Sequence, residues 1–171
     1  MSKKDETSWS IKKVFKEVAL FLLMLFTISM ILNYMRQPEI RENIYAYNLV
    51  DIESKKVKFS GYKGKPLVVH FWATWCPTCK LEASNIESLS SSYNVVTIAV
   101  NSGTNEALKR YMEKKSLTYS VINDRDGKLA KKFDIGAYPT TLIFNSKGAL
   151  SFAEVGYSTT LGLKARLEVI N

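Results

Sequence analysis

The chain has 171 residues, of which 46% are hydrophobic and 23% charged, and it holds only 8 Gly and 4 Pro. This composition excludes a collagen-like, low-complexity or disordered protein and fits a globular domain. Two cysteines are too few for a small scaffold held together by disulfides. The net charge of +8 is spread along the chain, so we interpret it as solvating charge and predict no nucleic-acid-binding surface.

An uncharged run near the N-terminus predicts a membrane-spanning helix. Residues 18–35 carry no charged side chain, and a helix of that length rises about 27 Å, close to the hydrocarbon thickness of a bilayer. Five lysines precede the run, and such an excess of positive charge keeps the N-terminus in the cytoplasm. The alternatives are a cleaved signal peptide, for which no clear Ala-x-Ala site follows, and a buried core helix, which the length and flanks disfavour.

This anchor predicts the organisation of the whole chain. We expect residues 1–17 in the cytoplasm, a transmembrane signal anchor at 18–35, a linker at 36–43 and an extracytoplasmic domain at 44–171. The protein would then lie in the cytoplasmic (inner) membrane as a single-pass protein, with the N-terminus inside and the domain periplasmic. A domain of this size can bury its own hydrophobic core.

Beyond the linker the pattern alternates between strands and helices. Short, β-branched apolar runs at Leu67–Trp72 and Val95–Val100 are typical of parallel strands that are covered on both faces. Apolar residues at helical spacing predict a helix from Pro77 to Ser90 between these strands. A second helix is expected after Thr104, whose side chain can cap its first turn.

The remaining elements complete an α/β domain. We expect, besides those above, a hairpin of Ile44–Val50 and Lys56–Phe59, a strand Tyr119–Ile122, a short helix Lys128–Phe133, a strand pair Thr141–Phe144 and Leu150–Val155, and a helix near Thr159–Ile170. The order β–α–β–α–β–α–β–β–α predicts a mixed central β-sheet flanked by helices.

Both cysteines lie in the segment Trp75–Cys79, which reads Trp-Cys-Pro-Thr-Cys, at a junction from strand to helix. Their spacing can close a small disulfide across the first helical turn. Pro77 suits the first helical position, which needs no backbone N–H, and the helix N-terminus favours a negative charge on Cys76. A thiolate in such a setting is the nucleophile of disulfide exchange. We therefore predict a redox-active pair, Cys76 and Cys79.

Two motifs carry a resemblance to a known family. The segment Phe71–Cys79, together with Ala137–Thr140, resembles the thioredoxin superfamily, and most closely its membrane-anchored TlpA/ResA/DsbE-like branch. Within that branch the chain is similar to the ScsD-like protein disulfide oxidoreductases, which are linked to suppression of copper sensitivity. The resemblance spans roughly residues 43–171 and implies a thioredoxin-like fold.

The resemblance also implies roles for the site residues. Cys76 would be the exposed attacking cysteine, Cys79 the buried resolving cysteine, and Pro139 a cis-proline that faces them. Because proline lacks an N–H, it leaves neighbouring backbone groups free to hold a substrate segment in extended form. The expected substrate-binding surface consists of Tyr138, Pro139, Thr140, Trp75, Pro77 and Thr78.

Two further residues are candidates for moving the proton of Cys79. Glu82 matches an acidic residue of the TlpA/ResA-like branch and lies three positions after Cys79 on the same helix face. Its alternative role is that of a solvated helix glutamate. His70 precedes Cys76 by six residues, and a neutral imidazole could relay a proton. Its alternative role is that of a satisfied core histidine.

Thiol–disulfide exchange needs no metal or organic cofactor, and we expect none. Zinc needs four ligands, whereas the chain offers two Cys and one His. Copper(I) accepts fewer and softer ligands, so a Cu(I)-handling module that uses the same cysteine pair stays open. A merely structural disulfide would close a very small loop and would constrain the unfolded chain little.

The position of Pro77 bears on the direction of electron flow. Reducing relatives commonly carry proline second between the cysteines, whereas oxidising DsbA-like sites carry it first, as here. We therefore favour an oxidant or isomerase-like partner over a reductant of apo-cytochrome c thiols in cytochrome c maturation. The expected partners are protein thiols and disulfides, with a DsbB-like or DsbD-like membrane redox partner.

Overall fold

The computed structural model describes residues 11–35 and 43–170. The chain divides into two compact units, residues 1–36 and 37–171, and each is described by itself. The expected cytoplasmic segment lies outside the described residues over 1–10, as does the expected linker over 36–42.

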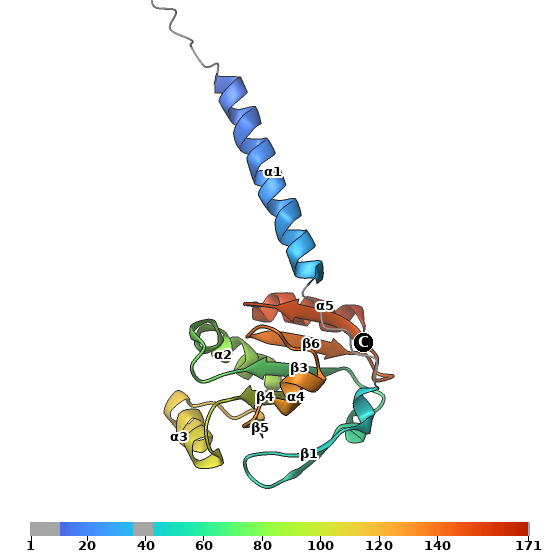
Figure 1. The fold of residues 1–171 in the computed structure, drawn as a ribbon. Coiled ribbons are helices and arrows are strands. Elements are labelled where there is room, and N and C mark those ends of the chain that lie inside the picture. The colour runs from blue at the N-terminus through green and yellow to red at the C-terminus, as the bar shows by residue number, and fades with distance from the viewer. Residues whose placement is uncertain (1–10, 36–42, 171) are drawn as a thin grey trace, which may run out of the picture. The chain divides into compact units, whose positions relative to one another are not determined.

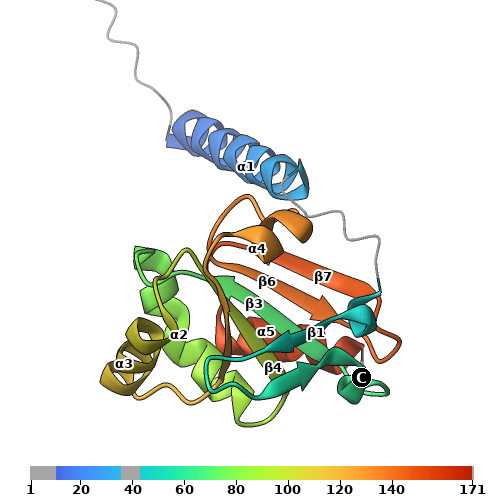
Figure 2. The same ribbon diagram turned by 60° about the horizontal axis from the view of Figure 1, so that its bottom comes forward.

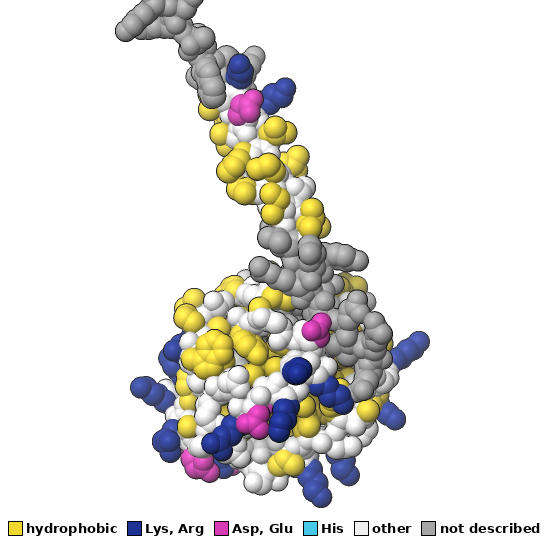
Figure 3. All heavy atoms as spheres, viewed as in Figure 1, with side chains coloured by type: hydrophobic (Ala, Val, Ile, Leu, Met, Phe, Trp, Pro, Cys, Tyr) yellow, Lys and Arg dark blue, Asp and Glu magenta, His cyan; other side chains and the backbone are white. Residues whose placement is uncertain are grey.

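The first unit contains one helix, α1 (Ile11–Met35). Apolar side chains cover much of its described surface, and its charged side chains gather toward one end (Figure 3). Within the part of the chain that the structure describes, no helix combines the length and the apolar character that crossing a membrane requires. The span predicted at 18–35 is therefore not confirmed. It includes residues 29 and 32–35, whose side chains lie outside the described residues.

The second unit is built on the predicted mixed β-sheet. Its strands are β3 (Leu67–Trp72), β4 (Asn94–Val100), β5 (Ser120–Asp124), β6 (Thr140–Phe144) and β7 (Leu150–Val155). They lie in the order β5-β4-β3-β6-β7, as Figure 1 shows for the central strands. The pairs β3–β4 and β4–β5 are parallel, whereas β6 is antiparallel to both β3 and β7.

The helices of this unit begin and end close to the predicted residues. They are α2 (Pro77–Ser90), α3 (Asn105–Lys115), α4 (Lys128–Lys132) and α5 (Thr160–Val169). The hydroxyls of Thr104 and Thr159 accept hydrogen bonds from backbone N–H groups in the first turns of α3 and α5. Such bonds satisfy donors that have no partner inside the helix and so define where it begins.

The N-terminal hairpin is shorter than predicted. Strands β1 (Asn48–Val50) and β2 (Lys56–Lys58) pair antiparallel, but the start of the expected first strand is a 3₁₀ helix, η1 (Ile44–Ala46). The side chain of Asn43 accepts a hydrogen bond from the backbone N–H of Tyr45, which favours this turn over an extended strand. A second 3₁₀ helix, η2, spans Phe59–Tyr62.

The sheet separates two apolar clusters. On one side, here called the α2 face, side chains of the strands pack against α2, α3 and α5. On the other side, the hairpin face, they pack against the β1–β2 hairpin, η1, η2 and α4. Figure 2 shows β1 and α4 in front of the sheet and α5 behind it. Because both faces are covered, the central strands are apolar runs and not alternating ones.

The strand directions decide where the functional side chains meet. The carboxyl ends of the parallel strands β3, β4 and β5 lie at one end of the sheet, and the antiparallel strand β6 begins there. The turn that leads into α2 and the residues before Thr140 therefore come together, although more than sixty residues separate them in sequence.

Candidate active site

The two cysteines lie in the first turn of α2. Cys76 is the residue that caps the helix, and its Sγ accepts a hydrogen bond from the backbone N–H of Cys79 at 3.2 Å. Pro77 takes the first helical position, as predicted, and is exposed, while Thr78 is half-buried. Both cysteines are free thiols. The sulfur of Cys76 therefore lies where the unpaired N–H groups and the dipole of a helix favour an anion.

The prediction that Cys76 is an exposed cysteine is wrong. Its exposed fraction is 4%, against 3% for Cys79. The cause is the packing around the sulfur: Cys76 Sγ lies 3.6 Å from the carbonyl oxygen of Tyr138, whose ring meets that of Trp75 edge to face at 5.8 Å. The two cysteines thus differ in their partners and not in their exposure.

The segment before β6 faces Cys76, as predicted. The peptide bond between Tyr138 and Pro139 is cis, and Pro139 is buried. The hydroxyl of Thr140 donates to the carbonyl oxygen of Ala137 at 2.9 Å, a bond that joins the two ends of this turn. The carbonyl group of Tyr138 is thereby held against the sulfur of Cys76.

A neighbouring turn supports the residues just before the cysteines. Trp75 is 55% exposed, and its indole N–H donates to the carbonyl oxygen of Asn101 at 3.2 Å. The backbone N–H of Thr74 donates to the hydroxyl of Ser102 at 3.0 Å. Sequence reasoning missed Asn101 and Ser102. The available signal was their place directly after a parallel strand, because such loops meet at one end of a sheet.

Cys79 is held as a neutral thiol. Burial raises its pKa to about 12, and its interactions with Cys76 and with the carboxylate of Glu82 add to this effect. A thiol of this kind attacks a disulfide only after it has lost its proton. Its chemistry therefore needs a proton acceptor close by.

Glu82 lies buried on α2, one turn beyond Cys79. Its Oε1 accepts a hydrogen bond from the backbone N–H of Ser158 at 3.1 Å, and its buried Oε2 has no hydrogen-bond partner among the described residues. Burial raises the pKa of this carboxyl to about 7, opposed by the bond from Ser158. The solvated alternative for Glu82 is thus wrong, and a carboxyl of this pKa can take up or release a proton near neutral pH.

His70 lies buried in the middle of β3, where its Nδ1 is 2.9 Å from the hydroxyl of Thr141 on β6. Burial lowers the pKa of the imidazole to about 3, so the ring is neutral at physiological pH. The hydrogen bond found for His70 in the described residues joins it to the sheet and not to Cys79. A relay through His70 stays a prediction.

An aromatic layer lies beneath the cysteines on the α2 face. The indole N–H of Trp72 donates to the hydroxyl of Thr97, and its ring lies 5.5 Å from that of Tyr111 and 6.2 Å from that of Tyr119. Trp72 thus belongs to the same buried apolar cluster as both cysteines. The two tyrosines were not predicted, because they come from segments that share no local pattern with β3.

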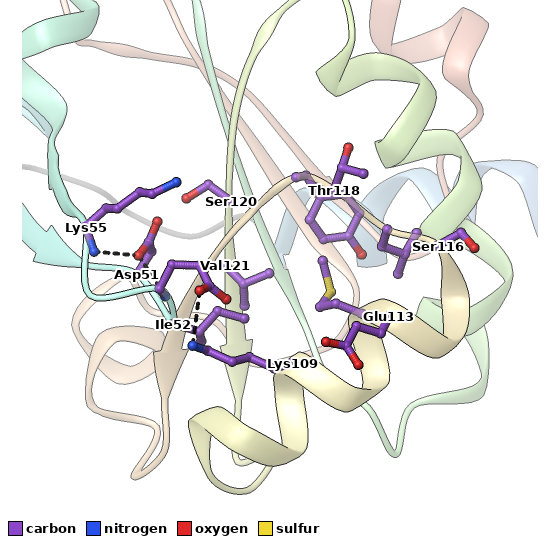
Figure 4. Close-up of a pocket in the computed structure, with 13 residues that line it drawn as sticks. Asp51, Ile52, Lys55, Lys109, Glu113, Ser116, Thr118, Ser120 and Val121 are labelled. Atoms are coloured by element: carbon purple, nitrogen blue, oxygen red, sulfur yellow. Dashed lines mark hydrogen bonds and ion pairs between the residues drawn. The ribbon is translucent and has the colours of Figure 1, made fainter.

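A separate hollow of about 610 Å³ lies at the edge strand β5 (Figure 4). Apolar side chains of Ile52, Met112 and Val121 line it, and an ion pair of Lys109 with Glu53 at 3.1 Å lies at its rim. Neither cysteine lines this hollow. Within residues 11–35 and 43–170, no group of three or more His, Cys, Asp or Glu could hold a metal ion.

A cysteine pair in the first turn of a helix, facing a cis-proline at the end of a mixed sheet, defines a thioredoxin-like thiol–disulfide oxidoreductase. Residues 40–153 match the AhpC/TSA family, and the chain belongs to this family. It is 31% identical over 159 residues to a thioredoxin-like protein of Haemophilus influenzae, covering 92% of this chain and 95% of that protein.

Other relatives agree with this class. The chain is 29% identical to the thiol–disulfide oxidoreductase ResA of Geobacillus thermodenitrificans, over 71% of this chain and 72% of that protein. The crystal structure of StoA from Bacillus subtilis is similar with a TM-score of 0.64 and 25% identity, covering 73% of this chain and 98% of that one. The chain is thus an enzyme of the ResA and StoA type, with the predicted thioredoxin-like fold.

Proposed function

We propose that this protein exchanges disulfides with protein partners through Cys76 and Cys79, as an extracytoplasmic enzyme tethered to the membrane. The observation that carries the proposal is the placement of Cys76 Sγ, which accepts the N–H of Cys79 at the N-terminus of α2 and faces the carbonyl group of Tyr138. The N–H bond and the helix dipole both favour the thiolate that leaves or attacks at this position.

In the oxidising direction the cycle begins with a disulfide between Cys76 and Cys79. A substrate thiolate attacks Cys76 Sγ, a mixed disulfide forms, and Cys79 leaves as a thiolate that takes a proton from Glu82. A second substrate thiolate then attacks the substrate sulfur of the mixed disulfide and releases the thiolate of Cys76. The substrate loses two electrons and the enzyme disulfide gains them. Reduction of a substrate runs through the same steps in reverse.

We place the enzyme on the oxidising side, with a DsbB-like membrane partner that restores its disulfide. The support is the position of Pro77 and the hydrogen bond from the Cys79 N–H to Cys76 Sγ at the helix N-terminus, because contacts that favour the reduced form make a stronger oxidant. The reduction potential of the cysteine pair decides: a value of about −120 mV supports an oxidant, and one of about −270 mV supports a reductant of apo-cytochrome c thiols with a DsbD-like partner.

The tether is proposed from the N-terminal sequence. Residues 18–35 hold no charged side chain, and apolar side chains of α1 such as Leu20, Phe21 and Leu22 are exposed. Apolar side chains that cover a helix are favourable in a lipid environment. Retention of the full chain in membranes after an alkaline wash would support the tether, and its release into the supernatant would contradict it.

The test of exchange is Cys79→Ala in the full chain. Without Cys79 the enzyme cannot form its internal disulfide, and a mixed disulfide that Cys76 forms with a substrate disulfide cannot be resolved by Cys79. Adducts on Cys76 should therefore persist, and turnover should fall at least about a thousandfold. Non-reducing electrophoresis with mass spectrometry would show adducts that disappear on reduction.

The matched control is Cys76→Ala, which keeps one thiol in the same turn of α2. It should form no adducts, since Cys79 is held as a neutral thiol. An absence of adducts in Cys79→Ala under oxidising conditions would contradict the proposed function. Adducts of equal yield in both variants would contradict the assignment of Cys76 as the attacking residue.

A further inference from the structure

The segment Gly156–Ser158, which follows β7, contacts both the cis-proline and the helix that carries the cysteines. The backbone N–H of Gly156 donates to the carbonyl oxygen of Pro139 at 2.8 Å, so the segment lies directly beside the cis-proline. Two residues further on, Ser158 bonds to α2, the helix that carries both cysteines. This segment had no role in the sequence analysis.

Both backbone groups of Ser158 are taken by side chains of α2. Its N–H donates to Glu82 Oε1 at 3.1 Å, and its carbonyl oxygen accepts from Asn85 Nδ2 at 3.0 Å. Glu82 and Asn85 are three positions apart and so lie on neighbouring positions of one helix face. Ser158 lies outside any helix or strand, yet its N–H and its carbonyl group both have hydrogen-bond partners, as they would in a β-sheet.

Asn85 has a second partner in the same segment. Its Nδ2 also donates to the phenol oxygen of Tyr157 at 3.0 Å. An amide nitrogen carries two hydrogens, so it can serve both acceptors at once, and the carbonyl oxygen of Ser158, which only accepts, fixes the orientation of the amide group. Tyr157 itself is 53% exposed. The bond therefore holds an exposed aromatic ring in the residue that follows Gly156, whose backbone N–H bonds to Pro139.

We infer that Asn85 is a positioning residue that holds Tyr157 at the substrate site. Trp75 forms one wall of that site, and Tyr157 forms a second wall on the opposite side of the cis-proline. The inference rests on the proposed function and names how a polypeptide substrate is held. The segment that carries the substrate cysteine lies between the exposed rings of Trp75 and Tyr157, and apolar side chains beside that cysteine are favoured. A small disulfide carries no polypeptide segment beside its sulfur, so its exchange should not depend on Tyr157.

The experiment compares two probes with the full chain: insulin as a protein disulfide and a small aromatic disulfide. Asn85→Ala removes both hydrogen bonds of the amide, so KM for insulin should rise about three- to tenfold, while kcat stays within about twofold because uniform binding alone is lost. Rates with the small disulfide should not change. Tyr157→Ala should raise KM for insulin by a similar factor, and Tyr157→Phe, which keeps the ring, should raise it less.

The matched control is Asn94→Ala at the start of β4. Its Nδ2 also donates to a backbone carbonyl oxygen, that of Pro66 at 3.1 Å, at the end of the sheet away from the cysteines. This variant should leave both substrates unaffected, whereas a general loss of stability would act on Asn94→Ala and Asn85→Ala alike.

An unchanged KM for insulin in a folded Asn85→Ala chain would overturn the inference, as would an equal loss with both probes. If Asn85→Ala does not fold, Tyr157→Ala decides, because that side chain is exposed, and an unchanged KM there overturns the inference. A parent chain that exchanges with neither probe would instead overturn the proposed function.

Discussion

The two faces of the β-sheet have different chemistry. The hairpin face is a continuous apolar cluster across the middle of the strands. The α2 face carries a row of buried polar residues there, because His70 is paired in register with Thr97 on β4 and with Thr141 on β6. The helix above this face adds the buried carboxyl of Glu82.

This difference indicates that one face of the sheet mainly stabilises the fold and that the other carries the chemistry of the cysteines. Buried polar groups cost free energy unless they are hydrogen-bonded, so a fold concentrates them where they serve a purpose. Across the middle of the strands they gather on the face that holds both cysteines, whereas on the hairpin face buried polar groups such as Asp124, which accepts from backbone N–H groups of α4, lie at the strand ends. Changes on the two faces should therefore have different signatures, and three predictions test this.

The largest effect is expected from Phe59→Ala on the hairpin face. Phe59 is fully buried in η2, and removal of its ring should lower the free energy of unfolding by about 3–5 kcal/mol. The rate at which Cys76 reacts with a small disulfide, per folded molecule, should stay unchanged. Urea unfolding and stopped-flow exchange measure the two quantities. A large change in the rate would show that the faces are not separable.

A smaller effect, with a pH signature, is expected from His70→Asn. Burial lowers the pKa of His70 from 6.5 to about 3. Between these two pH values the imidazole binds a proton in the unfolded chain but not in the folded chain. The free energy of unfolding therefore falls as the pH falls from 7 to 4, by about 3 kcal/mol from this group. His70→Asn should remove that part of the pH dependence in urea unfolding.

Thr141→Val is the control for this prediction. It removes the hydroxyl that lies 2.9 Å from the ring but keeps the buried imidazole, so the acid dependence should persist. If His70→Asn keeps the full acid dependence, the imidazole is not the cause.

The smallest effect on stability is expected from Glu82, with the opposite sign. Burial raises its pKa from 4.5 to about 7, so the folded chain keeps a proton that the unfolded chain loses. The free energy of unfolding thus falls as the pH rises from 5 to 8, by about 2 kcal/mol from this group, and Glu82→Gln should abolish this fall. Glu82→Gln should also slow the attack of Cys79 on a mixed disulfide at Cys76 about 10- to 100-fold, because Cys79 must first lose its proton, and should remove the inflection near pH 7 from the rate at which the adduct is released in this way.

Glu87→Gln is the matched control on the same helix. Its carboxylate accepts from the backbone N–H and the hydroxyl of Thr118, away from the cysteines. It should leave the rate of release and its pH inflection unchanged. Equal effects of the two variants would contradict a role for Glu82 in moving the proton of Cys79.

Much of the fold follows from local patterns. The apolar run Leu67–Trp72 and the helix Pro77–Ser90 begin and end at the predicted residues, since period, caps and turn residues act over a few positions. The start of the N-terminal hairpin was predicted as a strand and is a 3₁₀ helix instead. There a side-chain bond from Asn43 outweighs the apolar alternation, which is weak over so short a segment.

The sequence by itself determined the place of the cysteine pair, the helix start at Pro77 and the cis bond at Pro139, because each depends on neighbouring residues and on motifs that resemble a family. Only the tertiary structure decided that Cys76 is buried and that Ser158 is held by α2. The bonds of Ser158 to Glu82 and Asn85 join residues 76 and 73 positions apart. No local pattern encodes such contacts, since they exist only once the strand order has brought the segment after β7 beside α2.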